Sequence, residues 1–450
     1  MVMDVISMLG LLAGLIVLII MAYNGWGMIS TSLVAALIVI VTNRMDLWEA
    51  LSVHFAGFMK DYAGNYFLLF FLGALLGTLM SATGAAKSIA CKIVDLIGPS
   101  RGLLAVMIIT AILSYAGINT FVIVFTIWPI SVVLFKEGNI PKRLFIVAMF
   151  AGCGTFSMCG LPGTPAIQNI MPTETFGTTA YAAALNGLIV SAIIFVFCVI
   201  WLEWNRKMLQ KQGIGFEPGP DDDLDALDVS NRADQPPFRL AILPILLEIV
   251  YIFVLQQVIK SEWDTNFIII QALTFACILI VILFHKKVFK NIRQLFDDAA
   301  DKCLVALMTT AFVTGFGGVV QASHGFEIIQ NWAFSLDINP LISACIATGV
   351  VACATGSCSS GLAIFLSVLG PQYAALCTQQ GIPLEMLHRS IIWAGAGLDS
   401  FPHSGSVVTA WTYTGIKPKD SYKYMFVTNI GFTTLGCILT LALYFLFGIV

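Results

Sequence analysis

Long apolar stretches constrain this sequence more than any other feature. A helix needs about 20 apolar residues to cross the hydrocarbon core of a bilayer. Stretches of that kind recur at about 5–22, 28–42, 64–83, 180–203, 240–259, 266–285, 303–321 and 421–449. Since 58% of the residues are hydrophobic and only 11% are charged, a soluble fold could not bury so much apolar surface. The sequence therefore predicts an all-α polytopic membrane protein.

The charges and the cysteines exclude several other classes. A net charge of −3 offers no basic face for a nucleic acid. The 11 cysteines lie mostly inside apolar runs and lack metal-ligand spacing, so we expect small buried hydrophobes and neither a metal site nor a cofactor. The stretch 5–22 lacks the basic segment and the cleavage site of a signal peptide, and is predicted to remain as a span.

Two further apolar regions, 101–172 and 338–412, are interrupted by Gly, Pro, Ser, Thr and Asn. Each is interpreted as a re-entrant hairpin followed by a broken helix. The hairpins are predicted at 101–136 and 338–370, and the broken helices at 142–172 and 385–412. Short amphipathic pieces at 48–61, 86–96, 288–302 and 326–336 are too short to span and are expected in the interface.

The basic residues predict the orientation of the spans. With both termini outside, Arg44, Lys60, Lys260 and Arg389 are the only basic residues left outside, out of 23 lysines and arginines. Lysine and arginine favour cytoplasmic loops, so the reverse orientation is discarded.

The two halves of the chain resemble each other on either side of a polar segment. The segment 205–237 is rich in Pro, Gly and Asp and is predicted to be a cytoplasmic linker. It separates a first repeat, 1–204, from a second, 238–450. Gly138-Asn139-Ile140-Pro141 matches Gln380-Gly381-Ile382-Pro383 at nearly the same offset as further Gly, Pro and Asn pairs.

The number of spans in each half decides how the repeats are related. About five spans per half is an odd number, so the second copy must be inserted upside down, and inverted repeats with discontinuous helices are typical of secondary transporters. The prediction is two inverted repeats, each with about five transmembrane helices, a re-entrant hairpin and a broken helix.

The hairpin tips carry small polar side chains where a half-helix begins. In the first hairpin these are Asn119 and Thr120, and in the second Ser357, Ser359 and Ser360. The free N–H groups of such a half-helix offer a site for a carboxylate, and carbonyls of the same turn suit a small cation. The alternative is that these residues only cap a kink.

The broken helices supply the second pair of candidate segments. The first, 142–172, contributes Gly154, Thr155, Ser157 and Thr164, and the second, 385–412, contributes Ser400, His403 and Ser404 as substrate contacts. Asp399 and His403 are the only ionisable side chains in either interrupted core, and an ionisable residue inside the membrane is a functional candidate. Neither half is expected to offer a buried Arg or Lys, because Arg389 is placed near the outer end of its helix.

In these features the chain resembles a known family, the gluconate permeases (GntP). They belong to the bacterial organic-acid symporters of the ion-transporter superfamily. The resemblance rests on the repeat layout, on Gly356-Ser357, on Ser400-Phe401-Pro402-His403 and on the segment 161–167. It implies uptake of an aldonate such as gluconate or of a small hydroxy carboxylate by symport, an elevator-like movement of the hairpin domain, and a homodimer. It also implies a location in the cytoplasmic (inner) membrane of a bacterium.

The coupling ion is predicted to be a proton carried by Asp399 and His403. Gluconate permeases tend to have a Glu in the first hairpin, whereas Ile118-Asn119-Thr120 is more similar to the Ser-Asn-Thr motifs of sodium-coupled carboxylate carriers. Sodium bound at Asn119 and Ser357 is therefore the alternative. A passive anion channel is less favoured, because the polar residues cluster at two pairs of breaks. An enzyme is not expected, since no G-x-S-x-G, H-E-x-x-H or P-loop motif occurs.

Overall fold

The computed structural model describes residues 2–164, 166–219, 235–259, 263–334 and 338–450. Within these ranges the regular structure is helical and contains no strand. The first half comprises α1 (Val2–Tyr23), α2 (Met28–Thr42), α3 (Leu47–Glu49), η1 (Ala50–Phe55), α4 (Ala56–Thr83), α5 (Ala85–Ile97), η2 (Pro99–Arg101), α6 (Gly102–Tyr115), α7 (Thr120–Glu137), α8 (Leu144–Cys153), α9 (Phe156–Cys159), α10 (Ile167–Phe176) and α11 (Ala184–Lys211).

The second half comprises α12 (Phe238–Phe253), η3 (Val254–Val258), α13 (Thr265–Leu283), α14 (His285–Val288), α15 (Ile292–Gln321), α16 (His324–Phe334), α17 (Pro340–Thr355), α18 (Cys358–Val368), α19 (Gly370–Gln379), α20 (Leu384–Leu398), α21 (Gly405–Thr414), α22 (Pro418–Met425), η4 (Phe426–Phe432) and α23 (Thr433–Phe447). Residues 220–234 of the predicted linker 205–237 lie outside the described residues. The linker does not begin at 205 as expected, because α11 continues to Lys211.

Membrane-spanning helices are present as the sequence predicts. Among the described residues, seven helical stretches are long and apolar enough to cross a membrane, or up to nine if each of two sharply bent pairs is one span. The seven are Asp4–Tyr23, Leu47–Thr83, Thr120–Glu137, Ala184–Lys211, Thr265–Leu283, Ile292–Gln321 and Pro418–Phe447. The all-α membrane class is confirmed. Since α7 is one of the seven, the second arm of the first hairpin is long enough to cross, unlike the shorter α18.

Two of the four short amphipathic pieces are not separate helices. The piece expected at 48–61 is continuous with α4 in a helix over Leu47–Thr83, through the π-helical turn η1. Most of the piece expected at 288–302 is the first part of α15. A charged face does not end a helix, which needs a breaking residue or a cap. By contrast Gly84, with φ of 78° in the left-handed region, separates α4 from α5.

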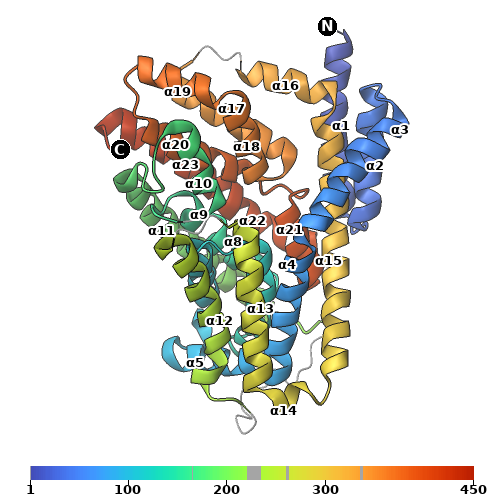
Figure 1. The fold of residues 1–450 in the computed structure, drawn as a ribbon, viewed down its shortest axis with the longest axis vertical. Coiled ribbons are helices and arrows are strands. Elements are labelled where there is room, and N and C mark those ends of the chain that lie inside the picture. The colour runs from blue at the N-terminus through green and yellow to red at the C-terminus, as the bar shows by residue number, and fades with distance from the viewer. Residues whose placement is uncertain (1, 165, 220–234, 260–262, 335–337) are drawn as a thin grey trace.

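Helices α4 and α15 form the central packing partners of the molecule. Figure 1 shows α15 running beside α4. Helix α15 also packs against α2, and α13 packs against α4. Glycines permit the close approach, since a Cβ at Gly318 would lie 2.6 Å from the carbonyl oxygen of His54. On another face of α4, a Cβ at Gly77 would lie 2.6 Å from the carbonyl oxygen of Phe125 in α7. The tip of the first hairpin is thus held against α4.

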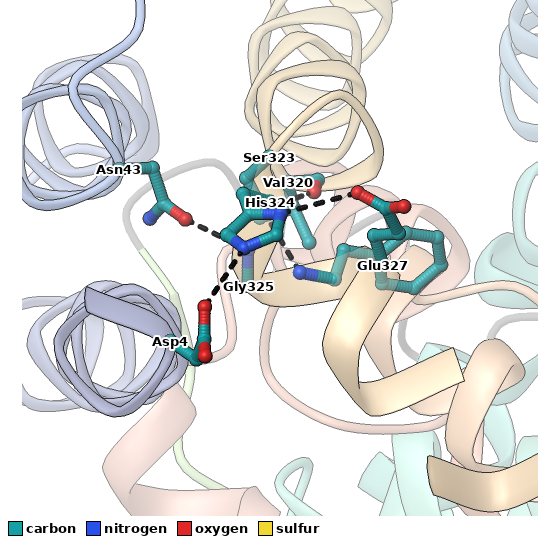
Figure 2. A network of polar contacts seen from close by, with 8 residues as sticks. Asp4, Asn43, Val320, Ser323, His324, Gly325 and Glu327 are labelled. Carbon is teal, nitrogen blue, oxygen red and sulfur yellow. Dashed lines mark hydrogen bonds and ion pairs between the residues drawn. The ribbon is translucent and has the colours of Figure 1, made fainter. Parts of the chain in front are cut away.

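A polar network joins the N-terminal part of α1 to the turn between α15 and α16 (Figure 2). The ring of His324 lies between two carboxylates, with Nε2 3.2 Å from Oδ1 of Asp4 and Nδ1 3.1 Å from Oε2 of Glu327. The N–H of Gly325 donates to Oδ1 of Asn43 at the end of α2 (2.8 Å). These contacts fix the turn that leads from α15 toward the second hairpin.

The two interrupted regions have the same local geometry where their broken helices begin. Asn139 and Gly381 both have φ in the left-handed region, at 45° and 69°, and a proline follows two residues later in each segment. Helices α8 and α20 then begin shortly after these prolines. The turn residues singled out in the sequence therefore shape equivalent chain reversals.

Candidate functional site

A cavity of about 380 Å³ lies where the hairpin tips and the helix breaks meet α4 and α15. Nine of the twelve residues predicted to contact a substrate line it, together with Asp399. The nine are Asn119, Thr120, Gly154, Ser357, Ser359, Ser360, Ser400, His403 and Ser404. Segments from both halves of the sequence thus converge on one space.

Each hairpin presents the beginning of a helix to this cavity. Asn119 precedes α7, and its Oδ1 accepts a hydrogen bond from the N–H of Phe121 (3.0 Å). Ser357 precedes α18, and its Oγ accepts from the N–H of Ser360 (3.3 Å). Asn and Ser are favoured at this position because they satisfy an N–H that has no partner in the helix. Asn119 and Ser357 therefore both cap a helix, and both also line the cavity.

The second broken helix contributes a third helix start. Helix α20 ends at Leu398, an irregular segment follows, and α21 begins at Gly405. Ser404 precedes α21, and its hydroxyl lies 3.2 Å from that of Ser406. The first turns of α7, α18 and α21 all border the cavity, and each carries the partial positive charge of a helix N-terminus. Their N–H groups favour an anion there.

Asp399 joins the break in α20 to the second hairpin. Its Oδ1 accepts a hydrogen bond from the hydroxyl of Ser400 (2.7 Å), and its Oδ2 accepts from the N–H of Cys358 at the start of α18 (3.3 Å). Ser400 in turn accepts from Nδ2 of Asn429 (3.4 Å). The carboxylate therefore caps a helix that begins in another part of the chain.

His403 is buried beside the same hairpin, with 4% of its surface exposed. Its Nε2 lies 2.7 Å from the carbonyl oxygen of Cys353 in α17. Since a carbonyl only accepts, Nε2 carries a hydrogen. In the described part of the chain Nδ1 has no hydrogen-bond partner. A buried polar atom of that kind at a cavity is available to a ligand.

Three predicted site residues do not line the cavity, and their hydroxyls donate to backbone carbonyls instead. The hydroxyl of Thr155 donates to the carbonyl of Ala151 (2.6 Å), and that of Ser157 to the carbonyl of Gly152 (2.6 Å). Thr164 donates to the carbonyl of Tyr115 at the end of α6 (3.2 Å). All three side chains are fully buried. Thr155 and Ser157 thus satisfy carbonyls at the interruption, and Thr164 joins the segment after it to the end of α6.

The cavity also has walls that were not expected from the sequence. Helix α4 contributes Phe58, Asp61, Tyr62, Asn65 and Tyr66, and α15 contributes Thr314, Gly317 and Gln321. The pairs Asp61/Asn65 and Tyr62/Tyr66 are four residues apart, the spacing of one helix face. In the sequence, that spacing is the feature that could have indicated a polar and aromatic face on this helix. Gln168 of α10 also lines the cavity, and its Nε2 donates to the hydroxyl of Ser359 (3.1 Å).

Arg389 lies in the second turn of α20 and is fully buried, so the expectation that neither half offers a buried Arg or Lys is wrong. Its guanidinium donates to the carbonyl of Cys159 through Nη1 (2.9 Å) and to that of Ala182 through Nη2 (2.8 Å). The positive charge therefore fastens the end of α9 and the segment before α11 to α20. It does not line the cavity, so it is not a direct contact for an anion there.

Comparison with known proteins identifies the family. The model of the GntP family permeases matches residues 3–446. The chain belongs to the GntP permease family. Among members of known sequence, the transporter YxjC of Bacillus subtilis (strain 168) is 31% identical over 461 residues, which cover 95% of this chain and 97% of that protein. A permease of Haemophilus influenzae is 22% identical over 76% of this chain and 73% of its own length.

Membership of this family indicates the general activity of the protein. A GntP permease is a transporter of the membrane and not an enzyme, in agreement with the spans of the fold. The interpretation of the sequence as a permease is confirmed. In the described residues no group of three or more His, Cys, Asp and Glu side chains is placed to hold a metal ion.

Proposed function

We propose that this permease imports a small organic anion, a gluconate-like aldonate or another hydroxy carboxylate, by symport with a cation, and that the cavity is its substrate site. The convergence of three helix N-termini with Asp399 and His403 on one space carries this proposal. Inverted repeats with half-helices that meet near the membrane midplane are a recurrent way to build a transport site.

Recognition of the carboxylate is assigned to the helix starts and their polar side chains. The described lining of the cavity contains Asn119, Thr120 and several serines but no lysine or arginine. The N-termini of α7, α18 and α21 supply the partial positive charge in place of a basic residue. Hydroxyl groups of a substrate would be recognised by the Ser, Thr and Asn side chains and by Nδ1 of His403.

The need for a cation follows from the charges at the site. An imported anion moves against an interior-negative potential, at a cost of about 2.3 kcal/mol for each charge per 100 mV. An ionised Asp399 would also repel it, by about 4 kcal/mol at about 4 Å with an effective dielectric constant near 20. A proton carried by Asp399 and His403 removes both costs. Sodium at Asn119 and Ser357, with hairpin carbonyls, is the second candidate and would explain the absence of an acid in the first hairpin.

The movement is proposed to be elevator-like, since the cavity lies between two kinds of element. Helices α4 and α15 form one wall, and the hairpins and broken helices form the other. The scaffold would be α1, α2, α4, α12, α13 and α15, and the hairpins with α20–α23 and α8–α11 would move against it. A homodimer in the inner membrane of a bacterium, with both termini outside, completes the proposal.

Counterflow in proteoliposomes tests this function against the passive channel. Vesicles loaded with unlabelled acid are diluted into a trace of labelled acid, for a panel of aldonates and hydroxy acids, with and without sodium. A carrier accumulates label transiently by exchange. A channel equilibrates label without an overshoot, and that result with every acid that permeates would contradict the proposal.

A further inference from the structure

The first turn of α18 is already occupied by a carboxylate of the protein itself. Oδ2 of Asp399 lies 3.3 Å from the N–H of Cys358, the first residue of the helix. This is the position at which the N-terminus of a half-helix would bind the carboxylate of a substrate. Two carboxylates cannot both take that N–H, and two negative charges so close together are not both retained.

The hydrogen bonds of Asp399 show that the arrangement suits the ionised acid. Both carboxylate oxygens accept, one from Ser400 and one from Cys358. Ser400 is itself held by Nδ2 of Asn429, whose Oδ1 accepts from the hydroxyl of Thr428 (3.1 Å). This chain of donors from η4 orients the hydroxyl of Ser400 toward Asp399 and leaves the second oxygen for α18.

Among the described residues, the groups that surround Asp399 include no partner of opposite charge. Titratable or charged side chains on neighbouring segments are Cys153 of α8, Cys159 of α9, Cys353 of α17, Cys358 of α18, Asp61, Tyr62 and Tyr66 of α4, Tyr422 of α22 and His403 in the break itself. Arg389, on the same helix, donates to backbone carbonyls elsewhere. Within the described residues, the donors of Ser400 and Cys358 are therefore what holds the carboxylate.

We propose that Asp399 competes with the substrate for the N-terminus of α18, and that a proton on Asp399 releases this terminus, so that each carboxylate bound takes up one proton. The inference rests on the function proposed above and deepens it, because it places the coupling at one hydrogen bond. It also gives Asp399 and His403 different roles, since Asp399 takes up the proton and His403 contacts the substrate.

When a protonated Asp399 gives way to the substrate, each contact that breaks is replaced by another. An O–H bond forms on the carboxylate of Asp399, and the contact from the Cys358 N–H to Oδ2 breaks. The freed N–H then donates to an oxygen of the substrate, so that the number of negative charges in the site is the same before and after. His403 keeps its hydrogen on Nε2 against the carbonyl of Cys353, and its Nδ1 stays free to accept from a hydroxyl of the substrate.

The test is a calorimetric measurement of binding to the purified full chain, because binding precedes any transport step. Gluconate, glycerate and lactate are titrated in two buffers of different ionisation enthalpy, in the presence of sodium chloride and again of choline chloride. For the acid that binds, we expect uptake of about one proton and a Kd that rises about tenfold for each pH unit once Asp399 is ionised in the free protein.

Two variants locate the proton. The Asp399→Asn variant is expected to bind the acid without taking up a proton and without a dependence on pH. The amide of Asn is already neutral, so no proton is needed before the substrate binds. Asp297→Asn, at a carboxylate of α15 that is 70% exposed and paired with Arg293, keeps the behaviour of the native protein. The native protein alone carries the primary result, so an unstable Asp399→Asn would not remove the test.

Failure of this inference and failure of the proposed function give different results in this experiment. Binding without proton uptake, or uptake that persists in Asp399→Asn, overturns this inference and leaves the proposed function on its sodium alternative. Absence of binding by all three acids in both salts contradicts the proposed function and this inference with it.

Discussion

The imidazole of His403 is fixed by the backbone carbonyl of Cys353, 2.7 Å from its Nε2. The two residues lie 50 positions apart, on the second broken helix and in the first arm of the second hairpin. Because the carbonyl assigns the hydrogen to Nε2, the neutral ring has a lone pair at Nδ1. The tautomer, and with it the kind of group the ring can recognise, is thus set by the fold.

Replacing His403 should therefore reduce discrimination for hydroxylated acids. In His403→Ala the affinity for lactate is expected to fall about tenfold, the equivalent of one hydrogen bond of about 1–1.5 kcal/mol, while that for propionate changes little. Competition binding with the two acids measures the ratio. An equal loss for both would assign His403 a purely structural role.

Asn119 should matter for binding beyond its role as a helix cap. Both Asn119→Ala and Asn339→Ala remove a cap, since Asn339 accepts from the N–H of Leu341 (3.0 Å) at the start of α17, and each is expected to cost about 1 kcal/mol of stability. Only Asn119 lines the cavity. Thermal unfolding and substrate affinity, measured on both, should show similar destabilisation but a loss of affinity in Asn119→Ala alone. Equal affinities would remove Asn119 from the site.

The contact between α4 and α7 should not tolerate a methyl group at Gly77. A Cβ there would lie 2.6 Å from the backbone oxygen of Phe125, whereas nothing lies within 4 Å of a Cβ at Gly64 on the same helix. Gly77→Ala is expected to destabilise the fold by about 1–3 kcal/mol, because backbone must shift, and Gly64→Ala to be neutral or slightly stabilising. Unfolding midpoints in detergent compare the two. A neutral Gly77→Ala would contradict the close packing of the hairpin tip on α4.

The network in Figure 2 should make stability depend weakly on pH. The hydrogen bonds with Asp4 and then Glu327 raise the pKa of His324 above its ordinary value of 6.5. Stability from the charged ring is therefore complete below that value and is lost as the pH rises through the raised pKa. The unfolding temperature of the native protein, relative to His324→Asn, should fall between about pH 6 and pH 8. His285→Asn is the control, and a difference that does not vary with pH would contradict this assignment.

The positions of the helix breaks, and several cavity residues, were accessible from the sequence because they are local. Gly, Pro and small polar residues interrupt apolar runs at Asn119, Ser357 and Asp399, and the start of a helix follows each interruption within a few residues. What a cap does to its own backbone is a short-range matter, so these sites could be assigned without tertiary contacts.

The remaining features depend on contacts between distant segments. Thr155 and Ser157 look equivalent to the hairpin serines in sequence, but nearby carbonyls of the break take their hydroxyls. Arg389 is buried because carbonyls about 200 positions earlier surround it, at Cys159 and Ala182. The spacing of Tyr62 and Tyr66 indicates one face of a helix. It does not indicate that this face of α4 lies against the hairpins, because that contact joins distant segments.

Cation-driven accumulation of an organic acid is the central claim, and uptake into sodium-free proteoliposomes with an imposed inward proton gradient tests it most directly. We expect the acid that shows counterflow to accumulate above its external concentration, to leave when a protonophore collapses the gradient, and not to accumulate in Asp399→Asn. A strict requirement for sodium at constant pH would contradict proton coupling. Uptake that never exceeds equilibrium with either a proton or a sodium gradient would contradict the claim itself.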